Sequence, residues 1–183
     1  MVYKATLQPT RVRYWCFWFK LSDPWQSQSA AGSKIMHLFV NGVNRVFLHA
    51  RGFGTTDPVY PWIGLQQLAS SYDATSQGGQ GVGGSVWLTP NQPGQLGVQI
   101  VRGQWVLMEG LVDAGTAGGA NGSVKWWING ALVGSYTGIP LVAAGGSATW
   151  EDWNWGPTWG GLGGTVAQTQ YQYIDEIYIS GRN

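Results

Sequence analysis

The chain has 183 residues, of which 44% are apolar and only 10% are charged, and its formal net charge is +1. A charge this close to zero, without a basic stripe, argues against a nucleic-acid partner, and the lack of a polybasic run argues against binding to an anionic membrane. Cys16 is the only cysteine, which excludes an intrachain disulfide and a cysteine-based metal site.

Residues 11–21 form the first predicted strand. Both of its faces are apolar, with Tyr14, Cys16 and Trp18 on one and Trp15, Phe17 and Phe19 on the other. This pattern is typical of a central strand that is covered on both sides. The apolar run at 14–19 is too short for a signal peptide, and no run reaches the ~18 residues of a membrane span.

Residues 34–41 and 45–51 are predicted to form a hairpin around a three-residue loop, with Asn44 in the left-handed region. In that register four side-chain pairs share one face, namely Ile35 with Arg51, His37 with His49, Phe39 with Phe47, and Asn41 with Arg45. A two-residue loop would break this pairing, so the register stays open.

The middle of the chain alternates short predicted strands with polar loops. Strands are expected at 59–68, where Pro61 interrupts the pattern, and at 82–88 and 95–101. The stretch at 74–84 is rich in Ser, Gln and Gly, which indicates a surface loop rather than a linker between domains.

The strongest local signal is Asn129-Gly130, which lies between apolar runs and follows a long predicted strand at 104–113. Asn-Gly in this setting predicts a hairpin with a type I′ turn, because that turn needs positive φ at both central residues. A closing strand is expected at 170–180. About nine to eleven short strands without a helical period predict an all-β sandwich, in a single domain over residues 1–183.

Three segments resemble the concanavalin A-like lectin/glucanase superfamily of laminin-G-like jelly rolls. They are the aromatic strand at 14–23, the strand and hairpin at 104–112 and 124–133, and the closing strand YIDEIYIS at 173–180. The resemblance implies a jelly-roll sandwich of two antiparallel sheets, with ligands on a concave sheet or at its rim. Members include lectins, carbohydrate-binding modules, glycoside hydrolases, polysaccharide lyases and viral surface proteins, so the fold does not select the function.

A glycoside hydrolase is not expected. Hydrolysis needs two carboxylates that flank the bond, and the ExDxxE motif of the glucanases of this superfamily is absent. Glu151-Asp152 and Asp175-Glu176 are adjacent pairs, and neighbours on a strand point to opposite faces. We therefore assign no catalytic residues.

The resemblance to polysaccharide lyases implies a His or Gln that neutralises a uronate, a Tyr that acts as base and acid, and Arg or Lys side chains that hold carboxylates. His37, His49, Arg45 and Arg51 supply part of this set in the three-residue register, and Tyr171 or Tyr173 would complete it. The lyase motifs themselves are not recognisable. The simpler interpretation is that both histidines are structural and lie beneath a loop.

Tryptophan gives the sharper signal, because twelve Trp are more than one core comfortably hides. Four of them, Trp150, Trp153, Trp155 and Trp159, fall within ten residues. Aromatic faces stack on the apolar faces of sugar rings, so we expect this segment to contact a ligand or partner at the rim of the concave sheet. The alternation of Trp153 and Trp155 also fits the buried face of a strand.

No metal or other cofactor is expected. Asp113, Asp152 and Asp175 are the candidates for a Ca²⁺ site, but no Asp-rich loop supports one. The function that these features favour is a non-catalytic glycan-binding module. One alternative is a viral or phage virion surface, decoration or tail protein, whose partners would be other copies of itself or a virion protein. A second is a polysaccharide lyase-like enzyme. An extracellular or virion-surface location is favoured.

Overall fold

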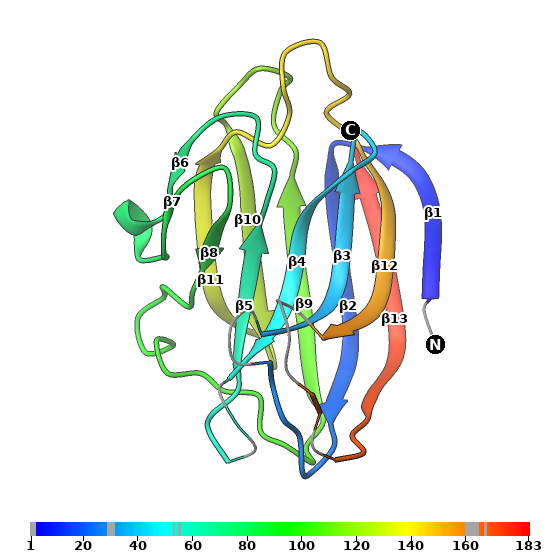
Figure 1. Cartoon of the computed structure of the whole chain (residues 1–183). Coiled ribbons are helices and arrows are strands. Elements are labelled where there is room, and N and C mark those ends of the chain that lie inside the picture. Colours follow the sequence, from blue (N-terminus) through cyan, green and yellow to red (C-terminus); the bar gives the residue numbers. More distant parts are fainter. Residues whose placement is uncertain (1–2, 29–31, 53, 55, 160–164, 167) are drawn as a thin grey trace.

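The computed structural model describes residues 3–28, 32–52, 54, 56–159, 165–166 and 168–183 as two facing β-sheets (Figure 1). The six-stranded sheet has the order β1 (Tyr3–Thr10), β12 (Trp150–Trp159), β3 (Ser33–Val40), β4 (Val43–Arg51), β5 (Tyr60–Leu65) and β8 (Val86–Leu88). The five-stranded sheet has the order β11 (Ala131–Ile139), β10 (Gly122–Ile128), β9 (Val106–Asp113), β2 (Val12–Leu21) and β13 (Gln172–Arg182). A short pair, β6 (Tyr72–Asp73) and β7 (Val82–Gly83), and a 3-10 turn at Thr75–Gln77 lie outside the two sheets. Every pairing is antiparallel, which confirms the predicted all-β sandwich of two antiparallel sheets.

The core lies between the two sheets. On β2, Trp15, Phe17 and Phe19 are buried and face inward, and Phe17 meets Trp153 of the opposite sheet edge-on at 6.0 Å. The other face of β2 is only half-buried, so the prediction that this strand is covered on both sides was wrong. Six of the twelve tryptophans are buried, namely Trp15, Trp25, Trp126, Trp150, Trp153 and Trp155, which confirms that one core does not hide them all.

Large aromatic rings lie directly over glycines on neighbouring strands. The cross-strand pairs are Trp15 with Gly110, Trp126 with Gly134, and Phe47 with Gly64. A Cβ added at any of these glycines would come within about 2.0–2.2 Å of the ring above it. These three glycines therefore leave the space that the rings occupy.

The two hairpins turn on the same dipeptide. Asn129 and Gly130 have φ values of 50° and 79°, as the predicted type I′ turn requires. Asn41 and Gly42 have φ values of 52° and 69°, so β3 and β4 are also joined by a two-residue turn. The predicted three-residue loop at 42–44, with Asn44 in the left-handed region, was therefore wrong.

The register of this second hairpin differs accordingly. His37 lies opposite Phe47, and His49 lies opposite Lys34, rather than the two histidines facing each other. Arg45 is the extra residue where the register shifts between Leu38 and Phe39. The expected strand at 95–101 is also absent from the described chain: this segment is a turn and loop, tied to the sheet by the Ile100 amide, which donates to the Val59 carbonyl at 2.7 Å.

Candidate functional site

The outward face of the six-stranded sheet carries a cluster of cationic and aromatic side chains. On β4, Phe47, His49 and Arg51 alternate with Val46, Leu48 and Ala50, which belong to the core, so the first three face outward. Cross-strand pairing adds His37, Lys34, Trp62 and, through Gly64, Trp87. We call this set the β4 face: Lys34, His37, Phe47, His49, Arg51, Trp62 and Trp87.

Cations lie over aromatic rings on this face. The Lys34 Nζ is 4.6 Å from the centroid of the Phe47 ring, and the Arg51 Cζ is 5.7 Å from the centroids of both Trp62 and Trp87. A cation within about 6 Å of a ring centroid is attracted to the π face. The two pairings thus hold positive charge against ring surfaces, of which those of Trp62 and Trp87 are partly exposed and that of Phe47 is buried.

His49 and Phe47 form the floor of the face. Their ring centroids are 4.7 Å apart, and Trp87 meets His49 edge-on at 4.4 Å. Both are buried, and His49 has no exposed surface. Beside them is a depression of about 180 Å³ lined by Lys34, Phe47, Leu65, Gln66, Ser85, Val86 and Trp87. A ligand on this face would meet Lys34, Arg51, Trp62 and Trp87, with His49 beneath them.

The electrostatics of the face favour anions. Burial lowers the pKa of the Arg51 guanidinium, but an arginine stays protonated at any physiological pH. Burial, and then the charge of Lys34, lower the pKa of His37, against a raising contribution from a hydrogen bond with the Gly156 backbone. The imidazole of His37 is therefore uncharged at neutral pH, and it can accept a proton.

The remaining candidates from the sequence are dispersed. Arg45 is nearly buried, and burial lowers the pKa of its guanidinium. Trp150 and Trp153 are completely buried, so a ligand on the surface cannot touch their rings. Trp155 and Trp159 line a different cavity, at the end of β12. The histidine–arginine group and the tryptophan group therefore do not form one site.

Sequence reasoning missed Lys34, Phe47, Trp62 and Trp87 as members of this site. Trp62 and Trp87 each sit between two buried residues of a short strand, a pattern that marks them as outward-facing. Their proximity to β3 and β4 follows from the order of the strands in the sheet. The residue pattern within a single strand does not predict that order.

The second cavity, which we call the end pocket, has a volume of about 600 Å³. It lies where β12 ends and β13 begins, and its aromatic lining comprises Trp25, Trp105, Trp155, Trp159, Tyr171 and Tyr173. Trp105 directly precedes β9, so the pocket is at the end of the sandwich from which β9 starts.

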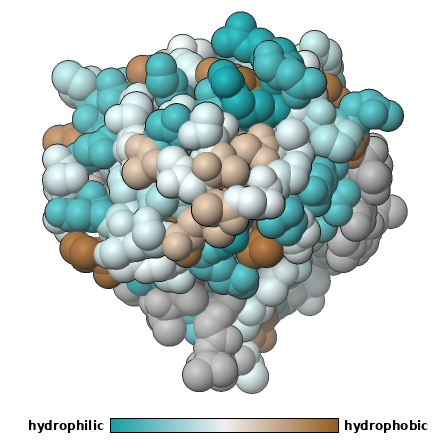
Figure 2. Space-filling view, turned by 90° about the horizontal axis from the view of Figure 1, so that it is seen from above, coloured by the Kyte–Doolittle hydropathy of each residue, from teal (hydrophilic) through white to brown (hydrophobic). Residues whose placement is uncertain are grey.

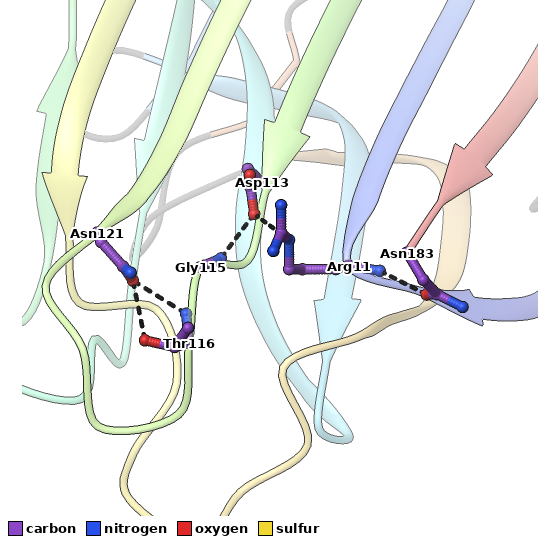
Figure 3. Close-up of polar contacts among 6 residues, drawn as sticks. All are labelled: Arg11, Asp113, Gly115, Thr116, Asn121 and Asn183. Atoms are coloured by element: carbon purple, nitrogen blue, oxygen red, sulfur yellow. Dashed lines mark hydrogen bonds and ion pairs between the residues drawn. The ribbon is translucent and has the colours of Figure 1, made fainter.

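The opposite end, where β9 finishes, is built from small and polar residues. Asp113 accepts a hydrogen bond from the Gly115 amide at 2.8 Å, and its Oδ1 is 3.3 Å from the Nε of Arg11, while Asn121 accepts from Thr116 (Figure 3). Figure 2 shows this end as mostly hydrophilic or neutral residues with scattered hydrophobic ones. Asp113 is thus occupied by an ion pair and a loop contact, and the described residues contain no group of three or more His, Cys, Asp or Glu that could hold a metal ion.

Comparisons with known proteins place the chain by fold. No protein-family model and no curated protein sequence matches it. Among solved structures, an endo-β-1,4-glucuronan lyase from the fungus Trichoderma reesei matches with a TM-score of 0.63 and 16% identity, over 96% of this chain and 71% of that one. Alginate lyase Aly36B matches with a TM-score of 0.59 and 15% identity, over 100% and 73%. A tetrameric galectin from the sponge Cinachyrella sp. matches with a TM-score of 0.52 and 9% identity, over 98% and 99%.

These similarities show the concanavalin A-like jelly roll and a group of structural neighbours that cleave or bind glycans. Within the part of the chain that the structure describes, no helix is long and apolar enough to cross a membrane.

Proposed function

We propose that this protein is a glycan-binding module that takes an acidic polysaccharide along the β4 face. The observation that carries the proposal is the stacking of Arg51 against Trp62 and Trp87, with Lys34 over Phe47 on the same face. A uronic acid residue needs both parts of this arrangement. Its ring has an apolar C–H surface that stacks on an aromatic face, and its carboxylate pairs with a guanidinium in a bidentate geometry.

The neighbours support an acidic ligand. The glucuronan lyase and the alginate lyase act on polymers of uronic acids, and a double mutant of the alginate lyase has been solved with an alginate tetrasaccharide. The cations of the β4 face match the charge of such polymers. Each stacked ring contributes on the order of 1 kcal/mol, so two or three contacts give millimolar-to-micromolar affinity, as expected of a module that acts in several copies.

The test is a calorimetric titration with a glucuronate or alginate oligosaccharide, against a cello-oligosaccharide of equal length. Arg51→Gln and Trp87→Ala should each weaken binding of the acidic ligand by about five- to tenfold. The matched control is Lys125→Gln, because Lys125 lies on β10 of the other sheet. Equal binding of the neutral ligand, or unchanged affinity in both β4-face variants with unchanged melting temperatures, would contradict the proposal.

A second candidate, a polysaccharide lyase, rests on His37. β-Elimination transfers the C5 proton of a uronate to a base, forms the C4–C5 double bond and breaks the C4–O bond, whose oxygen takes a proton from the protonated base or from water. A neighbouring cation offsets the charge of the carboxylate. The uncharged His37 imidazole, with the Lys34 ammonium close enough to lower its pKa, offers such a pair. Incubation with polyglucuronate or alginate should then yield C4–C5 unsaturated ends, detected by ultraviolet absorbance and lost in His37→Gln. If no unsaturated product forms, the module binds without cleaving.

A further inference from the structure

The end pocket is a second cavity, of which the β4 face makes no use. Its volume of about 600 Å³ is within the range of small-molecule sites, about 300–1,000 Å³. Its walls come from both sheets, since Trp155 and Trp159 belong to β12 and Tyr173 belongs to β13. The cavity therefore forms only when the sandwich is folded.

Three aromatic rings at the rim are open to solvent. Trp105, Tyr171 and Tyr173 are 42%, 56% and 41% exposed. The Nζ of Lys20 is 5.0 Å from the centroid of the Trp105 ring and 4.7 Å from that of the Tyr173 ring, so one cation contacts both rings. Exposed aromatic rings that gather at one cavity are typical of a binding site.

The residues that line the pocket also include polar atoms without a hydrogen-bond partner. Four buried polar atoms of its lining residues have no hydrogen-bond partner in the described chain, namely Ser33 Oγ, Trp155 Nε1, Trp159 Nε1 and Gln172 Oε1. Buried indole N–H groups without a partner also occur in the core, at Trp15, Trp126 and Trp150, so the mixture of groups at the cavity matters more than their number. The set offers both donors and acceptors, which sugar hydroxyls satisfy because each hydroxyl both donates and accepts.

The charge of the pocket differs from that of the β4 face. Asp175 is the one charged side chain among the described residues that line it. The Asp175 carboxylate in the wall and the Lys20 ammonium at the rim offset each other, so the pocket does not select an acidic residue, and the carboxylate accepts hydrogen bonds from neutral hydroxyls.

We propose that the end pocket is a second carbohydrate site, which takes a neutral pyranose residue. The sugar ring stacks on the rim aromatics Trp105 and Tyr173, and its hydroxyls bond to Gln172 and to the indole N–H groups of the wall. The module thus recognises a neutral residue at one end of the sandwich and acidic residues on its sheet face.

The test is an NMR titration of the whole chain with cellobiose, maltose, lactose and N,N′-diacetylchitobiose, and with a glucuronate trisaccharide for comparison. We expect at least one neutral disaccharide to bind with a millimolar Kd that 0.5 M NaCl does not change. Trp105→Ala and Tyr173→Ala should each raise that Kd at least about fivefold, whereas Tyr173→Phe, which keeps the ring, should change it less than twofold. Trp87→Ala, on the β4 face, is the matched control and should leave it unchanged.

Three outcomes would overturn this proposal: no binding of any neutral disaccharide, binding that survives both rim variants, or loss of binding in Trp87→Ala. Preferential binding of the glucuronate trisaccharide at the rim would refute the assignment of a neutral ligand. The rim side chains are exposed, so their truncation should leave the melting temperature within about 2 °C of wild type. None of these results depends on whether the β4 face binds an acidic glycan.

Discussion

Replacing Gly64 by Ala should displace the Phe47 ring, which forms part of the floor of the β4 face. A Cβ at this position would lie 2.1 Å from Cε2 of Phe47. Carbon atoms normally stay about 3.5–4.0 Å apart, so the ring must move by roughly 1.5 Å. Overpacking of this kind costs about 1–3 kcal/mol, which exceeds the ~0.4–1 kcal/mol that Gly→Ala gains by restricting the unfolded chain. The displaced ring is the one beneath Lys34 and beside His49.

Urea denaturation and thermal unfolding measure this effect. The net cost is then up to about 2.6 kcal/mol. At about 2–4 °C per kcal/mol for a chain of this size, we expect Gly64→Ala to lower the melting temperature by up to roughly 10 °C, and to weaken binding of a glucuronate oligosaccharide. Gly97→Ala is the matched control, because nothing lies within 4 Å of a Cβ there. If the two variants are equally stable, the Phe47 ring does not occupy the space above Gly64 and our description of the face is wrong.

Three further predictions concern other elements. Gly130→Val should destabilise the protein by about 1–3 kcal/mol in urea titrations, because a β-branched residue is strained at φ 79°; an unchanged midpoint would count against the turn. Asp113→Asn should cost less than about 1 kcal/mol, since the ion pair with Arg11 is partly exposed, and the difference from wild type should vanish in 1 M salt. The lowered pKa of His37 means that the unfolded chain takes up this proton first, so stability should fall as the pH drops below about 6.5, and His37→Gln should flatten that part of the profile.

The fold could be predicted because its strongest signals are local. Asn129-Gly130 specifies its own turn, and the alternation along β9 and β10 matches the buried face of the five-stranded sheet. The same dipeptide at Asn41-Gly42 specifies a two-residue turn as well, so this hairpin too follows from a local signal. The two-residue turn is what separates His49 from His37, because the register shifts at Arg45 and between Lys34 and Met36 cancel before His49 is reached; such bulges depend on packing rather than on the residue pattern.

The sites were harder to predict because they depend on sheet order. Trp150 and Trp153 resemble stacking platforms in the sequence, yet both face the core, because the register shift between Trp150 and Asp152 puts the two rings on the same side of β12. Trp62 and Trp87 come from strands that are far from Lys34 in the sequence, and only the order β3–β4–β5–β8 brings them together. The alternative of a virion surface or tail protein stays a prediction, because none of the structures compared above bears on it.

The location of the acidic ligand is the central claim, and the tryptophan side chains can report on it directly. Labelling the indole nitrogens gives one NMR signal for each of the twelve Trp, which single substitutions assign. On titration with a glucuronate oligosaccharide, we expect the signals of Trp62 and Trp87 to shift most, and those of the buried Trp150 and Trp153 to stay in place. Shifts confined to Trp105 and Trp159, or no shifts at saturating ligand, would contradict an acidic-glycan site on the β4 face.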